Sequence, residues 1–244
     1  MGLFNLGASY NRPGPGIPKD APKKTGVKLF FDILGREFWP LLSLHFIYLL
    51  ACIPIVTIGP ATAAMCRVTV TMVRDENVYA WRDFWIAFRK NLKQGILFGI
   101  PATLFVVAAI VLNLGVFTLD TSQMGNLVFM VFIFLWTFLG VGVGCYIFPM
   151  VAYVDLPWFP LLKNALLLLV LGKFRTLAAV AVSVGCCAAV VLLSPMSAPV
   201  VLFCGYFSFI CFFTTFMVWP VISKYVLREN QEEQLELPEL DATK

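Results

Sequence analysis

Few side chains in this chain have the chemistry for a functional site, and they are widely separated. His45 is the only histidine and lies in the middle of an apolar run, while Arg67 interrupts a second apolar segment. An ionisable side chain inside such a segment is a candidate functional group. The alternatives are structural: His45 as a neutral residue hydrogen-bonded to a neighbouring helix, and Arg67 as a side chain that extends to a polar surface instead of binding an anion in a cavity.

Catalytic and metal-binding patterns are not found in the sequence. The acidic residues lie outside the long apolar runs, and one histidine supplies no nucleophile–base constellation. The seven cysteines show no paired C-x-x-C spacing. Gly140, Gly142 and Gly144 lack the strand–turn–helix context of a nucleotide site and instead form a small face suited to helix packing. We therefore expect no enzyme activity, no catalytic residue, no metal and no cofactor.

Composition defines the broad class. Apolar residues make up 60% of the chain and charged residues 13%, with a mean hydropathy of +0.86, whereas soluble domains have about 25% charged residues. The apolar runs are continuous and close to the ~20 residues that a helix needs to span a bilayer. The sequence predicts an all-α, polytopic transmembrane helix bundle with about five membrane-embedded helices and no nucleic-acid partner.

The chain divides into three parts. Residues 1–28 are predicted to be a flexible basic arm rich in Pro and Gly, 29–228 a single transmembrane domain, and 229–244 a disordered acidic tail. Within the domain, four long apolar runs predict crossings, at Gly95–Phe117, Leu127–Val154, Leu177–Leu193 and Val200–Val226. The apolar stretch Leu161–Leu171 reaches only about half a span and predicts a short embedded or surface helix.

The segment "WRDFWIAFRKNLK" at 81–93 has a different pattern. Aromatic and apolar residues recur at helical spacing, and basic residues lie off that stripe. This pattern predicts a helix on the membrane surface, with its aromatic face in the headgroup boundary and its basic face on anionic lipid. The predicted interface residues are Trp81, Arg82, Phe84, Trp85, Phe88, Arg89, Lys90 and Lys93.

The apolar stretch from Phe38 to Val73 is interrupted by "PIVTIGP". Pro54 removes a backbone donor and Pro60 disfavours helix at Gly59, so this stretch is predicted to be two pieces joined by an irregular connector, in which Thr57 offers a hydroxyl to a freed carbonyl. We expect neighbouring helices to cover the connector's freed carbonyls, because irregular backbone at membrane depth requires protein or a water-filled cavity around it.

The distribution of Lys and Arg bears on topology. Six precede the first apolar run and six lie from Arg67 to Lys93, whereas none lies in 118–126 or 194–199. Because basic loops stay in the cytoplasm, a hairpin broken at Pro54–Pro60 would leave both termini cytoplasmic. A single crossing with an external N-terminus is the alternative.

The same residues carry a family resemblance. The block "PIVTIGPA", the charged turn "VRDEN" and the segment "WRDFWIAFRKNLKQG" resemble the YesL family of bacterial integral membrane proteins, a domain-of-unknown-function family, over about Phe30 to Tyr225. The resemblance implies a multi-pass protein of the bacterial plasma membrane, with an accessory role near carbohydrate uptake and no established reaction. The implied partners are anionic lipid headgroups and other membrane proteins such as a sugar transporter.

Two function classes follow from these observations. The first is a non-enzymatic accessory or scaffold component, favoured by the shortage of embedded polar groups. The second is a small permease or channel-like protein with a path lined by the Pro54–Pro60 break and Arg67, favoured because broken helices recur at transporter sites.

Overall fold

The computed structural model describes residues 26–116, 124–154, 156–192 and 205–227, and these residues form helices and connecting turns without a strand. The elements are α1 (Val27–Arg36), α2 (Phe38–Ala51), the 3₁₀ turn η1 (Ile55–Thr57), α3 (Ile58–Val73), α4 (Ala80–Lys90), α5 (Leu92–Val116), α6 (Met124–Tyr153), α7 (Trp158–Leu171), α8 (Lys173–Leu192), α10 (Tyr206–Ile222) and the π-helical turn η2 (Ser223–Leu227). The predicted arm up to residue 25 and the predicted tail lie outside the described residues. The helix α1 begins at Val27, within the last residues assigned to the arm.

The predicted all-α class is confirmed. Five helical segments in the described residues are long and apolar enough to cross a membrane. They are Ile55–Val73, Leu92–Val116, Met124–Tyr153, Lys173–Val190 and Tyr206–Leu227. The short apolar stretch before Leu171 is a 14-residue helix, α7.

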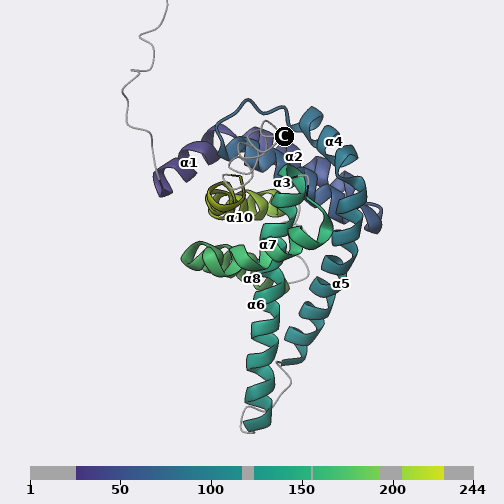
Figure 1. Cartoon of the computed structure of the whole chain (residues 1–244), viewed down its shortest axis with the longest axis vertical. Coiled ribbons are helices and arrows are strands. Elements are labelled where there is room, and N and C mark those ends of the chain that lie inside the picture. The colour runs from purple at the N-terminus through teal and green to yellow at the C-terminus, as the bar shows by residue number, and fades with distance from the viewer. Residues whose placement is uncertain (1–25, 117–123, 155, 193–204, 228–244) are drawn as a thin grey trace, which may run out of the picture.

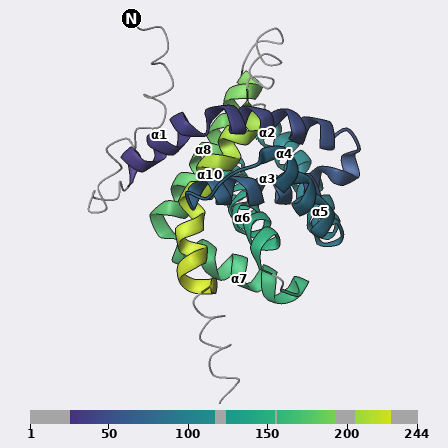
Figure 2. The same cartoon turned by 90° about the horizontal axis from the view of Figure 1, so that it is seen from above.

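The helices α5 and α6 form a long hairpin that projects from the rest of the molecule (Figure 1). The helices α8 and α10 run across α6 and not alongside it, as Figures 1 and 2 both show. Within the hairpin, the Asn113 amide donates to Thr137 Oγ1 at 3.0 Å and so links the two helices through a polar contact. Many other side chains of this hairpin are exposed apolar residues, which suits a hydrocarbon environment.

The stretch Phe38–Val73 is a broken hairpin. The Arg36 guanidinium, at the end of α1, pairs with Asp75, just after α3, and Tyr48 lies 3.4 Å from Thr62 between their hydroxyl oxygens. The beginning of α2 therefore lies beside the end of α3, so the chain returns to the side from which it entered. The pKa of Arg36 is raised, chiefly by its hydrogen bond to Glu37, with Asp75 adding to the shift.

The break is shorter than predicted. Helix α2 ends at Ala51, and α3 already begins at Ile58, so Gly59 and Pro60 lie in the first turn of α3. Proline is tolerated there because the first-turn N–H groups have no helical partner. The irregular backbone is thus limited to residues 52–57.

The expectation that neighbouring helices cover this connector is wrong, because Ile53, Pro54, Ile55 and Val56 are exposed. Instead, the Thr57 hydroxyl lies 2.6 Å from Ala51 O and 2.6 Å from Pro54 O, as a donor shared between the two carbonyls. The predicted role of Thr57 is confirmed.

Helix α3 lies at the centre of the packing. One apolar cluster joins its Ala64, Met65 and Val68 to α1, α2, α4 and α10. A second cluster joins its Ala63 and Val70 to α6, α7, α8 and α10. These two clusters hold the short helices α1, α2, α4 and α7 against the long ones.

Candidate functional site

The backbones of α3 and α5 cross at very close range, at glycine positions of both helices. A Cβ atom placed on Gly59 would lie 2.0 Å from Gly95 O and 2.5 Å from Gly99 Cα. A Cβ on Gly99 would lie 2.4 Å from Gly59 Cα. Only glycine therefore fits at these positions, and the spacing of Gly95 and Gly99 is the G-x-x-x-G pattern of tight helix pairs in membranes.

This contact corrects the predicted role of Gly59. Pro60 was expected to disfavour helix at Gly59, but Gly59 is helical and has an ordinary negative φ. Glycine is required at this position because the backbone of α5 leaves no room for a Cβ atom. The G-x-x-x-G pattern at 95–99 was the available sequence signal for this contact, but it does not identify the partner helix.

Arg67 is held by the C-terminal end of α6. Its guanidinium carbon lies 3.7 Å from the centroid of the Tyr153 ring, and Nη1 donates to Ala152 O at 3.3 Å. The Tyr153 hydroxyl lies 3.2 Å from Thr71 Oγ1, and its ring centroid lies 4.8 Å from that of Trp219. A cation at a helix C-terminus is favourable because the last carbonyls carry partial negative charge. The contacts of Arg67 thus link α3 with α6.

His45 lies on α2, whose apolar residues belong to the first cluster, and it is completely buried. Its ring is stacked on Phe207 of α10, with centroids 6.0 Å apart and an interplanar angle of 17°. No group of three or more His, Cys, Asp or Glu side chains that could hold a metal ion occurs in the described part of the chain. His45 therefore contributes aromatic packing between α2 and α10.

The predicted surface helix exists as α4, but its aromatic stripe divides between two environments. Phe84 is fully buried and Phe88 almost so, both in the first apolar cluster, where the two rings stack on each other at 6.1 Å. The prediction that both rings enter the headgroup boundary is wrong, because a helical apolar face can equally pack on protein. Trp81 remains exposed and Trp85 half-buried.

The outer face of α4 carries a surface hollow of about 500 Å³. Its lining combines aromatic and basic side chains, from Trp81, Arg82, Trp85, Ile86 and Arg89. Arg89 and Lys90 lie in the last turn of α4, while Lys93 lies in the first turn of α5 and is exposed. This outer face, and not the Phe84–Phe88 side, is available to a lipid surface.

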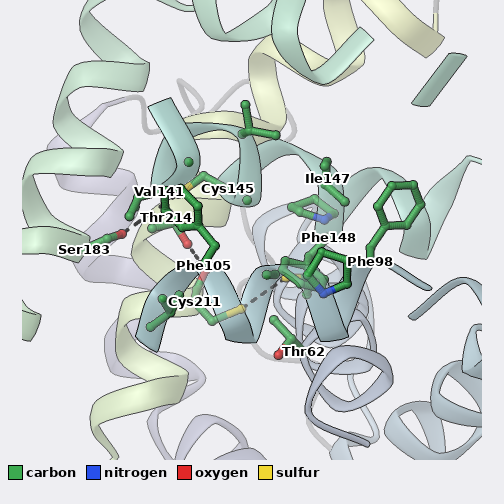
Figure 3. A pocket seen from close by; sticks show the side chains of 18 of the residues that line it. Thr62, Phe98, Phe105, Val141, Cys145, Ile147, Phe148, Ser183, Cys211 and Thr214 are labelled. Atoms are coloured by element: carbon green, nitrogen blue, oxygen red, sulfur yellow. Dashed lines mark hydrogen bonds between the residues drawn. The ribbon is translucent and has the colours of Figure 1, made fainter. Parts of the chain in front are cut away.

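A cavity of about 710 Å³ lies between α3, α5, α6, α7 and α10, and α2 and α8 each add one lining residue, Tyr48 and Ser183 (Figure 3). Pro101 and Pro149, which remove one backbone hydrogen bond each from α5 and α6, both line it. In Figure 3, Ser183 lies on one side and Phe98 on the other. Volumes of about 300–1,000 Å³ are typical of small-molecule sites.

The lining of this cavity is mostly apolar, and its Thr and Ser hydroxyls donate to helix carbonyls. The Thr62 hydroxyl donates to Ile58 O at 2.7 Å, Ser183 to Ala179 O at 2.8 Å, and Thr214 to Ile210 O at 2.9 Å. The thiols of Cys66 and Cys211 lie 3.5 Å apart at the wall. Among the described residues, the lining includes neither Arg67 nor the Pro54–Pro60 break. A polar solute would find few directed hydrogen bonds here.

The glycines at 140, 142 and 144 have separate roles around this cavity. A Cβ on Gly140 would overlap the Phe105 ring at 1.9 Å, and one on Gly142 would lie 2.6 Å from Leu169. The predicted packing role is therefore confirmed for these two. A Cβ on Gly144 would meet nothing within 4 Å, because Gly144 faces the open cavity.

Comparison with known proteins identifies a family match for part of the chain. Residues 39–114 match the model of the family described as "Protein of unknown function, DUF624". This match confirms the predicted resemblance for the segment that contains α2, α3, α4 and most of α5, and the narrower YesL label is compatible with it. No curated protein and no solved structure matched the chain.

Proposed function

We propose that this protein is a non-enzymatic accessory or scaffold component of the bacterial plasma membrane, associated with carbohydrate uptake. The observation that carries the proposal is the projecting α5–α6 hairpin, whose exposed apolar side chains suit contact with lipid and with helices of another membrane protein (Figure 1). The link to carbohydrate uptake rests on the family resemblance alone.

The described polar groups support this role over catalysis. Arg67 and Thr57 both bond to helix carbonyls, so they stabilise the fold. A transport path is the second candidate function, and the 710 Å³ cavity favours it. Its apolar lining argues against a sugar as the solute, because a sugar needs many hydrogen-bond partners in a site that excludes water.

We further propose that both termini are cytoplasmic. The basic arm and the basic segment from Arg67 to Lys93 flank the α2–α3 hairpin, and cytoplasmic loops are enriched in Lys and Arg. The pairing of Arg36 with Asp75 supports this topology, since it joins the two ends of the hairpin.

The test of the accessory role is purification of the tagged full chain from its native membrane in mild detergent. We expect one sugar-transporter subunit to copurify in a near-stoichiometric amount. A photoreactive amino acid at Val107 of α5 or Val131 of α6, both exposed, should cross-link to that subunit, whereas the same group at Glu76, outside the hairpin, should not. Recovery of the chain alone, or equal cross-linking of the subunit from all three positions, would contradict the accessory role.

A further inference from the structure

We propose that the interhelical cavity binds one acyl chain of a membrane phospholipid, with the lipid phosphate near Lys93 and Lys163. This inference goes beyond the accessory role and rests only on the embedding of the helices in a bilayer. It concerns the 710 Å³ cavity between α5, α6 and α7.

The opening of the cavity faces the surroundings of the long helices. Several lining residues are themselves exposed, among them Leu97 on α5, Leu139 on α6, and Trp158 and Leu166 on α7. If α5 and α6 cross the bilayer, these residues contact hydrocarbon, so the molecule that reaches the opening is a lipid chain and not water. Because the cavity lining is mostly apolar, an acyl chain can fill it without leaving polar groups that lack hydrogen-bond partners.

The dimensions of the cavity suit one leaflet. On α5 its lining runs from Leu97 to Val106, which at 1.5 Å per residue is roughly 14 Å. Half of a ~30 Å hydrocarbon core is about 15 Å. An acyl chain that enters beside Leu97 therefore extends along the hairpin for the depth of its own leaflet.

Cations lie where the headgroup would be. Lys93 is exposed and stands one helical turn before Leu97 on the same face of α5. Gln94 Nε2 donates to Leu156 O at 3.2 Å, which brings the beginning of α5 next to the segment that leads into Trp158. Lys163 is exposed and follows the cavity residue Leu162. Tryptophan with lysine is typical of the membrane interface, and lysine attracts phosphate.

Gly144 allows the cavity to be filled without disturbing the packing. Its absent side chain leaves open space in the cavity, so Gly144→Leu should occupy part of the acyl-chain volume. Gly185 of α8 is a matched control, because a Cβ there also meets nothing within 4 Å and this residue lies outside the cavity lining. Gly185→Leu therefore adds the same side chain to a long apolar helix and leaves the cavity unchanged.

The experiment is native mass spectrometry of the full chain purified in mild detergent and incubated with phosphatidylglycerol or with oleic acid. We expect wild type and Gly185→Leu to retain one phosphatidylglycerol per chain, and Gly144→Leu to retain at least tenfold less. Lys93→Gln combined with Lys163→Gln should lower phosphatidylglycerol retention severalfold. Equal retention by the Gly144→Leu and Gly185→Leu variants, or retention of oleic acid in place of the phospholipid, would overturn the proposal.

A second measurement covers the case in which Gly144→Leu fails to fold. Wild-type protein in vesicles that contain phosphatidylglycerol with a diazirine in mid-chain should be cross-linked at cavity residues such as Phe105 and Gly144. Cross-links confined to outward residues of the hairpin, such as Val128 and Val131, would overturn the proposal.

Discussion

Replacement of Gly59 by alanine tests the α3–α5 crossing. The new Cβ would lie 2.0 Å from Gly95 O, whereas ordinary van der Waals contact begins at 3.4 Å. The two helices must therefore separate locally by about 1.4 Å, the difference between these distances. Because the opposing atoms are backbone, no side-chain rotation relieves the overlap, and we expect a cost of about 1–3 kcal/mol in unfolding free energy.

The matched control is Gly185→Ala, where the added methyl group meets open space. Alanine favours helix over glycine by up to about 1 kcal/mol, so this variant should be as stable as wild type or more stable. The two variants should then differ by about 1–4 kcal/mol, which corresponds to about 2–16 °C in Tm for a chain of this size. The assay is thermal unfolding of both variants in the same detergent. A Gly59→Ala protein with the Tm of Gly185→Ala would refute the crossing as described.

Three further predictions follow from the contacts at the break, at Arg67 and on α4. Thr57→Val should lower the unfolding free energy by about 1–2 kcal/mol, because Ala51 O and Pro54 O lose their shared donor. Thr57→Ser retains a hydroxyl donor and should keep most of the wild-type stability, so equal stabilities of the two variants would contradict this role. A double-mutant cycle of Arg67→Gln and Tyr153→Leu should give a coupling free energy of about 0.5–2 kcal/mol, and additive effects would show that the ring contact contributes nothing. Replacement of the four basic residues of the α4–α5 surface by Gln should weaken the binding of a 79–94 peptide to anionic vesicles by about 1 kcal/mol per residue, and unchanged binding would show that this helix is held by protein alone. These residues are Arg82, Arg89, Lys90 and Lys93.

The sequence was sufficient to predict the long helices and the break. Continuous apolar runs leave only helix as a membrane structure, because every backbone group must be bonded within its own segment. Pro54 marked the interruption, since it has no N–H for the helix ladder. The function of Thr57 was also predictable, because its hydroxyl acts on carbonyls only a few residues away.

Partners across the fold were not predictable. The Phe84–Phe88 face of α4 has the periodicity of a lipid-contacting face, and burial against protein gives the same pattern because both environments are apolar. Arg67 finds its ring partner at Tyr153, far along the chain, and Gly59 finds Gly95 and Gly99 on a helix that the local pattern does not specify. The cavity is lined by residues of seven described helices, from α2 to α10, and has no local signature.

We propose that the α2–α3 hairpin lies in the membrane with both ends on the cytoplasmic side. Single cysteines at Gly35, just before α2, and at Glu76, just after α3, can be introduced into a variant whose own cysteines are replaced, because both positions are exposed. A membrane-impermeant thiol reagent should modify neither position in intact cells and both after the membrane is permeabilised. Modification of either position in intact cells, and above all of one without the other, would contradict the hairpin topology.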